Sequence, residues 1–186
     1  MTKRAVVFMT TAIIAVILLS FAFPLRLSDT DSKGFFEVFG SHKIIIIKNK
    51  LILLFFRENK PAVIYRVAIG RGGKEATPEG VHKVTDKEKN YSWWPTKDQK
   101  KLAKKRGSIL PKVVSCTDPR NPWGSRRLKL DVKQGDGYDV FLHDTNQPYA
   151  IGKAITTGCV RVGKKAMDEL YDEIDIGDSI VVVKSF

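Results

Sequence analysis

Short stretches of β-branched, aromatic and other apolar residues recur along residues 43–186, separated by turns rich in Gly, Asn and Pro. This pattern constrains the fold most, because runs of about four to eight such residues are typical of strands. Residues 44–47 and 51–56 contain no polar side chain, which indicates strands that are buried on both faces or packed against a partner layer. The sequence predicts strands at residues 44–47, 51–56, 62–69, 81–84, 127–132, 138–142 and 179–184. So many short strands predict a mainly β domain, either a sandwich or a barrel.

Only two segments have the pattern of helices, and both are short. Residues 164–174 form an amphipathic helix whose apolar stripe is Met167, Leu170, Tyr171 and Ile174. Residues 97–106 follow Thr96, which matches a capping box with Gln99. This second helix is strongly basic and follows Trp93 and Trp94. Residues 87–126 are therefore interpreted either as a solvated insert or as a surface that binds sugar rings and anionic groups.

The N-terminus has the pattern of an export signal. Lys3 and Arg4 precede residues 5–23, which contain no charge and are long enough to span a bilayer. A signal peptide cleaved near Ala22 is the alternative to an uncleaved anchor. Both interpretations place the rest of the chain outside the cytoplasm, in the periplasm or on the cell-wall side. The expected organisation is an anchor or signal helix at 1–23, a linker at 24–42 and one domain at 43–186.

Charge and cysteine content narrow the class of partners and cofactors. The formal net charge of +12 favours anionic surfaces such as lipid head groups or cell-wall polymers. Nucleic acid is excluded as a partner by the expected compartment and by the absence of nucleic-acid-binding motifs. The two cysteines, Cys116 and Cys159, are expected to be unpaired. No set of four Cys or His residues has zinc-site spacing, so we expect no metal and no cofactor.

A histidine and a cysteine carry the chemistry of the chain. His143 directly follows the predicted strand at 138–142, and Cys159 lies in the turn Thr156-Thr157-Gly158-Cys159-Val160-Arg161. An imidazole can take the proton of a thiol and later return it to a leaving group. The backbone N–H groups of Gly158 and Cys159 could stabilise an oxyanion. The order His, Cys, Arg differs from papain-like enzymes, in which Cys precedes His.

This order and spacing resembles the L,D-transpeptidase catalytic domain, the YkuD-like family, over roughly residues 42–184. The resemblance includes Thr77-Pro78-Glu79-Gly80 and the closing Gly177-Asp178-Ser179. Asp144 stands where the family usually has Gly, and Thr156 stands where it usually has Ser. A charge at Asp144 would raise the pKa of His143, and a catalytic Cys159 would have a depressed pKa.

The resemblance implies roles for the remaining residues. Cys159 would be the nucleophile and His143 the base and then the acid, with its imidazole oriented by the backbone carbonyl of Asp144. Arg161 would hold a substrate carboxylate or brace the Cys turn. Thr156 and Thr157 would form hydrogen bonds close to the nucleophile or would simply stabilise the turn.

The implied activity is acyl transfer on peptidoglycan stem peptides. Cys159 would form a thioester with the diamino acid of a donor tetrapeptide, and an amine would resolve it. If water resolves the thioester, the chain is an L,D-carboxypeptidase. The alternative from another class is a non-catalytic wall-binding module that uses the basic helix and the two Trp residues.

Overall fold

The computed structural model describes residues 43–57 and 60–185. The predicted helix at 1–23 and the linker at 24–42 lie outside these residues. Within the described part the strands are β1 (Ile44–Ile47), β2 (Ile52–Arg57), β3 (Lys60–Arg66), β4 (Ile69–Gly70), β5 (Gly80–Lys89), β6 (Trp123–Lys133), β7 (Asp139–Thr145), β8 (Ala154–Thr156), β9 (Val160–Val162) and β10 (Ser179–Val183). The α-helices are α3 (Lys97–Lys105) and α4 (Lys164–Glu173), so the described fold is mainly β. None of the helices in these ranges is both long and apolar enough to cross a membrane.

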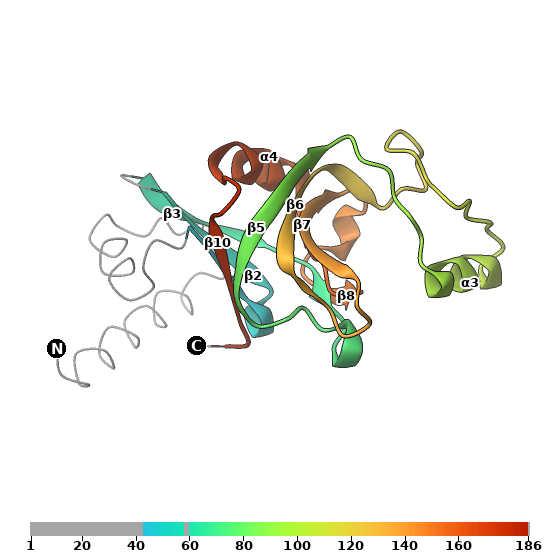
Figure 1. The fold of residues 1–186 in the computed structure, drawn as a ribbon, viewed down its shortest axis with the longest axis horizontal. Helices are drawn as coiled ribbons and strands as arrows, with labels where there is room; N and C mark the ends of the chain where they lie inside the picture. Colours follow the sequence, from blue (N-terminus) through green and yellow to red (C-terminus); the bar gives the residue numbers. More distant parts are fainter. Residues whose placement is uncertain (1–42, 58–59, 186) are drawn as a thin grey trace.

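Eight strands form one curved sheet in the order β3-β2-β1-β10-β5-β6-β7-β9 (Figure 1). The pairs β1/β10 and β7/β9 are parallel, and the other neighbours are antiparallel. Just beyond β3, Ala68 exchanges two backbone hydrogen bonds with Arg161 of β9, at 2.8 and 2.9 Å. The two ends of the sheet therefore meet at this point, which gives the fold its barrel-like closure.

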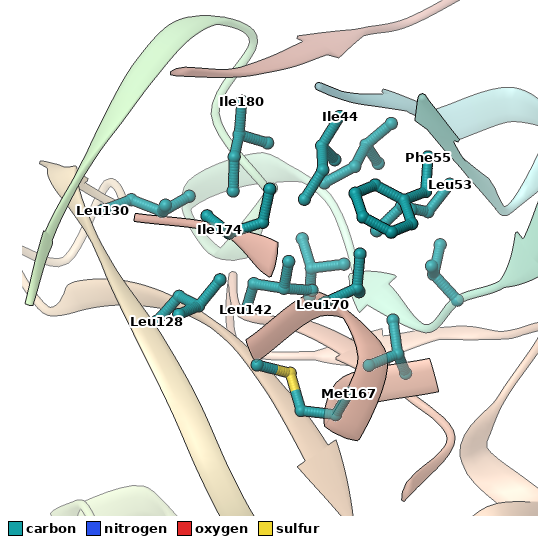
Figure 2. Packing of buried hydrophobic residues seen from close by; sticks show 14 of the residues in the cluster. Ile44, Leu53, Phe55, Leu128, Leu130, Leu142, Met167, Leu170, Ile174 and Ile180 are labelled. Atoms are coloured by element: carbon teal, nitrogen blue, oxygen red, sulfur yellow. The ribbon is translucent and has the colours of Figure 1, made fainter. Parts of the chain in front are cut away.

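The main core lies between this sheet and α4. Met167 and Leu170 project from α4, and Ile174 from the residue that follows it, onto strand residues such as Leu142 and Phe55 (Figure 2). This confirms the apolar stripe predicted for the helix. All four residues of β1 are at most 2% exposed, because alternate residues enter two separate clusters on opposite faces. The prediction that the first two strands are buried on both faces is confirmed.

The sheet contains more and longer strands than the sequence predicts. β5 and β6 extend beyond the predicted runs into polar residues, because residues 86–89 pair with residues 126–129. The predicted strand at 62–69 divides into β3 and β4, and the short β8 and β9 were not predicted. These two strands have three residues each, too few to show a period, and their pairing partners are distant in sequence.

Residues 90–122, which we call the arm, leave the sheet between β5 and β6. The arm is rooted by buried Tyr91, Trp93, Val114 and Asn121, and Trp93 and Val114 form a β-bridge. It carries α3 to the end of the molecule opposite β3 (Figure 1). The predicted capping box is present: Thr96 N–H donates to Gln99 Oε1 at 2.8 Å, and Gln99 N–H donates to Thr96 Oγ1 at 3.3 Å.

Candidate active site

A row of three side chains crosses the sheet and defines the candidate site. Arg127 of β6 pairs in register with His143 of β7, which pairs in register with Arg161 of β9. Residues in register on neighbouring strands share a face of the sheet, so a buried imidazole lies between two guanidinium groups. Cys159 lies two residues before Arg161.

This face forms the floor of a cleft of about 280 Å³, which the arm borders. Five of its fourteen lining residues are Trp, Tyr or Phe, and the other nine are charged or polar. It is lined by Trp93, Trp94, Thr96, Gln99, Trp123, Arg127, Tyr138, Asp139, Phe141, His143, Thr156, Thr157, Cys159 and Arg161. Five of the seven predicted site residues line it, whereas Gly158 and Asp144 support it from behind. The arm is thus part of the cleft wall rather than a separate solvated insert.

His143 is fully buried and has a fixed orientation. Its Nδ1 lies 2.6 Å from the backbone carbonyl oxygen of Asp144, as the resemblance implied. A carbonyl can only accept, so Nδ1 carries the proton and Nε2 holds the lone pair. Nε2 is buried and has no hydrogen-bond partner among the described residues. Burial, followed by the positive charge of Arg161, lowers the pKa of His143 to about 3. The imidazole is therefore neutral over the physiological range.

The side chain of Asp144 does not act on His143 as the sequence suggested. Its carboxylate accepts hydrogen bonds from Ser125 N–H at 2.8 Å and from Arg126 N–H at 2.9 Å. Adjacent residues of a strand point to opposite faces, so these two side chains diverge. The expected rise in the pKa of His143 is wrong, because burial and the nearby Arg161 act in the opposite direction.

The turn before Cys159 is braced by two threonines. Thr156 Oγ1 accepts from Gly158 N–H at 3.2 Å and donates to the carbonyl oxygen of Cys159 at 2.6 Å. Thr77 Oγ1 accepts from Gly70 N–H and donates to the carbonyl oxygen of Gly158, both at 2.9 Å. The Gly158 N–H already donates to Thr156 Oγ1. It could therefore donate to an oxyanion only by sharing its hydrogen between the two acceptors or by breaking its hydrogen bond to Thr156. The N–H of Cys159 is thus the stronger candidate donor.

Gly158 itself is required by two features of this turn. Its φ is +116°, a backbone conformation that side chains disfavour. A Cβ at this position would also lie 2.9 Å from Cβ of Gln134.

Arg161 is a half-buried cation with few partners. Its Nη1 donates to Gln147 Oε1 at 3.2 Å, and its Nε is buried without a partner. No described carboxylate lies within ion-pair distance of it. Burial lowers the pKa of Arg161, which means that the site destabilises the cation before ligand arrives. A substrate carboxylate would supply the missing countercharge.

Burial also raises the pKa of the Cys159 thiol. A backbone hydrogen bond from Phe141 and the charges of Arg161 and Arg127 oppose this effect without overcoming it. The expectation of a depressed thiol pKa is therefore wrong. The resting pair is a neutral thiol and a neutral imidazole, so deprotonation of Cys159 must accompany attack on the substrate.

This charge state predicts slow labelling of Cys159 at neutral pH. In a Cys116→Ser background, the rate of alkylation by iodoacetamide should rise with pH and reach half its maximum above the usual thiol range of about 8.5. Mass spectrometry of the labelled protein over a pH series measures this rate. A plateau already reached at pH 7 would show that a thiolate is present at rest.

Three residues of the site had little or no signal in the sequence. Arg127 had no signal of its own, because charged residues alternate with apolar ones throughout the predicted strand at 127–132. Trp123 lies outside the predicted strands and had none. Thr77 belongs to the Thr-Pro-Glu-Gly segment, but its hydrogen bond to Gly158 crosses 81 positions and depends on the fold.

Two further features concern cysteine and metal chemistry. Cys116 and Cys159 are both unpaired. In the described part of the chain, no group of three or more His, Cys, Asp or Glu residues is arranged to hold a metal ion.

Comparison with known proteins identifies the family. A model of the L,D-transpeptidase catalytic domain (YkuD) matches residues 41–183. The probable L,D-transpeptidase YcfS of Escherichia coli K12 is 31% identical over 144 residues, which cover 76% of this chain but only 44% of that protein. The putative L,D-transpeptidase YqjB of Bacillus subtilis 168 is 29% identical over 143 residues, 77% of this chain and 72% of that protein.

Solved structures agree in fold. A crystal structure of a cysteine-to-serine mutant of Enterococcus faecium L,D-transpeptidase superposes with a TM-score of 0.54 at 18% identity, over 76% of this chain and 49% of that one. The NMR structure of the catalytic domain of an E. faecium L,D-transpeptidase acylated by ertapenem gives 0.51 at 21% identity, over 75% and 95%. Since the family model covers most of the chain, this protein belongs to the L,D-transpeptidase catalytic-domain family.

Proposed function

We propose that this chain is a cysteine-dependent L,D-transpeptidase that acts on peptidoglycan stem peptides. One observation carries the proposal: a neutral His143, with Nδ1 held by a carbonyl and Nε2 buried without a partner, shares a cleft with the Cys159 thiol. Relatives named as L,D-transpeptidases support the substrate class. Incubation with a purified disaccharide-tetrapeptide tests it, because transfer releases D-alanine and joins two stems.

In the acylation step, Sγ of Cys159 attacks the carbonyl carbon of the diamino acid of the donor while the thiol proton passes to Nε2 of His143. The N–H of Cys159 stabilises the oxyanion. As the tetrahedral intermediate collapses, the C–N bond to the terminal D-alanine breaks, and the imidazolium gives its proton to the leaving amine. The low pKa of His143 makes its imidazolium a strong acid, which suits protonation of a poor leaving group.

In the transfer step, the amine of a second stem attacks the thioester and loses a proton to His143. The C–S bond breaks, and the Cys159 sulfur recovers the proton. Arg161 binds a carboxylate of the donor, because it lines the cleft without a countercharge.

The compartment follows from the substrate. We propose that the domain works outside the cytoplasm and that residues 1–23 direct its export. The uncharged stretch after Lys3 and Arg4 motivates this proposal. Alkaline carbonate extraction of membranes, with the N-terminal sequence of the native protein, distinguishes an anchored chain from a cleaved one.

We propose, in addition, that α3 binds an anionic polymer of the cell wall. Lys97, Lys101, Lys104 and Lys105 are exposed and recur at helical spacing, so they form one face of α3. No described acid pairs with any of them. Gln99 lies on the cleft side of the same helix. The arm would thus hold a wall strand beside the cleft that receives its stem peptide.

Charge reversal of Lys101, Lys104 and Lys105 to Glu should weaken binding to purified sacculi, and binding by the wild type should fall as salt rises. Exposed charges are screened over about 8 Å at physiological ionic strength, so the effect should be electrostatic. Co-sedimentation measures the binding. A control with Lys83, Lys133 and Lys165 changed to Glu alters the net charge equally, away from the arm. Equal losses in both triple variants would contradict the proposal, as would unchanged binding.

A further inference from the structure

The strand next to His143 contains an irregularity opposite Asp144. Trp123 pairs with Thr145, and Arg127 pairs with His143. Three residues of β6, Gly124, Ser125 and Arg126, therefore stand opposite the single residue Asp144. Such a bulge leaves backbone N–H groups without a partner on the neighbouring strand.

The buried carboxylate of Asp144 fills this bulge. Its Oδ2 accepts from Ser125 N–H at 2.8 Å and from Ser125 Oγ at 3.2 Å, and its Oδ1 accepts from Arg126 N–H at 2.9 Å. Asp144 is only 2% exposed, so these hydrogen bonds replace its hydration. The N–H groups of the bulge and the carboxylate oxygens thus satisfy each other's hydrogen-bonding capacity.

Gly124 makes the room that this carboxylate needs. A Cβ at position 124 would lie 2.0 Å from Cγ of Asp144 and 2.1 Å from its Oδ2. Real Cβ atoms do not approach other atoms so closely, and the carboxylate is held too firmly to move aside. The backbone of Gly124 has no positive φ, so space alone explains the glycine.

The two ends of the bulge place side chains around the imidazole. The Trp123 ring packs against His143, with 5.2 Å between ring centroids. The Arg127 guanidinium lies 4.2 Å from the Tyr91 ring centroid and donates to both carboxylate oxygens of Glu88, at 2.7 and 2.8 Å. On the opposite strand, the carbonyl of Asp144 itself holds Nδ1 of His143. One residue therefore connects the bulge to the orientation of the base.

We propose that the Asp144 side chain and Gly124 are a matched pair of positioning residues, which fix the β6 bulge and through it hold His143 ready for proton transfer. The effect on catalysis rests on the proposed function, whereas the coupling between the two positions does not. The pair also explains why this chain departs from the usual family Gly at 144: an Asp fits there because position 124 has no side chain.

A double-mutant cycle on the full chain tests the coupling by thermal unfolding. Gly124→Ala should lower the melting temperature by at least ~5 °C, because the new methyl group overpacks a site that cannot yield. In an Asp144→Gly background the same substitution should cost little, since the clash is gone. Gly163→Ala is the matched control: it has open space around its Cβ and an ordinary φ of −65°. Additive losses in the double variant would overturn the pairing.

Acylation by a carbapenem tests the positioning role. Asp144→Asn keeps the volume but turns an acceptor into a donor that faces a backbone N–H. The maximal acylation rate should fall by about 10- to 100-fold, while the concentration for half-maximal rate changes by less than about threefold, because geometry is lost rather than binding. Asp131→Asn is the control, since Asp131 also accepts a backbone N–H, from Lys83 at 2.8 Å, but lies outside the cleft. A wild-type rate in Asp144→Asn would overturn the role. If the wild type is not acylated, the proposed function fails while the unfolding cycle still decides the coupling.

Discussion

Replacement of Cys159 by serine is expected to abolish both turnover of stem peptides and acylation by a carbapenem. A hydroxyl is a far weaker acid than a thiol, so it gives up its proton to the neutral His143 much less readily during attack. Muropeptide analysis and the intact mass of carbapenem-treated protein measure the two losses. The fold should persist, because serine and cysteine differ little in volume.

Cys116→Ser is the matched control for this prediction. Cys116 is also unpaired, but it lies on the arm and does not line the cleft. The Cys116→Ser substitution should leave the turnover of stem peptides and the carbapenem adduct on Cys159 unchanged. Turnover by Cys159→Ser, or a carbapenem adduct on Cys116 in the wild type, would show that another group performs the chemistry.

Replacement of His143 by alanine is expected to lower the maximal turnover rate by about 10²- to 10⁴-fold, the usual contribution of a positioned general base. The loss should be large because the neutral thiol of Cys159 depends on a base at the moment of attack. Steady-state kinetics with purified stem peptides measure it. His82→Gln is the control, because His82 lies outside the cleft, near the carbonyl oxygen of Pro78.

The pH dependence gives a second measure of His143. Its pKa of about 3 means that the base keeps its lone pair well below the ordinary histidine range of about 6.5. Protonation of His143 should therefore cause no loss of turnover between pH 7 and pH 5. Any loss in this range should remain in His143→Ala. An acid limb near pH 6.5 that disappears in His143→Ala would contradict the buried, neutral imidazole.

Local signals in the sequence predicted the helices and the core strands. The capping box of Thr96 and Gln99 and the stripe of Met167 and Leu170 depend on residues at most four positions apart, and both are present in the structure. Continuous apolar runs predicted the double burial of β1 because composition alone decides it. β8 and β9 could not be found in this way, since distant strands determine their pairing.

The sequence predicted which residues meet in the candidate site, but it did not predict their charge states. The motif predicted that His143, Cys159 and Arg161 meet, and the cleft contains all three. The pKa expectations failed because they considered sequence neighbours, whereas burial and Arg161 decide the charge state of His143. The alternation of side chains along a strand would have placed Asp144 away from the imidazole. The burial of His143, the position of Arg127 beside it and the bulge in β6 depend on the folded structure and could not be predicted from the sequence.

Mass analysis of the products from a purified disaccharide-tetrapeptide shows whether this chain transfers a stem peptide to an amine. We expect free D-alanine and a dimer whose mass equals two donors less one D-alanine, with neither product formed by Cys159→Ser. Release of D-alanine with only a tripeptide product would contradict transfer to an amine. An unchanged tetrapeptide, under conditions in which the protein is folded, would contradict the activity itself.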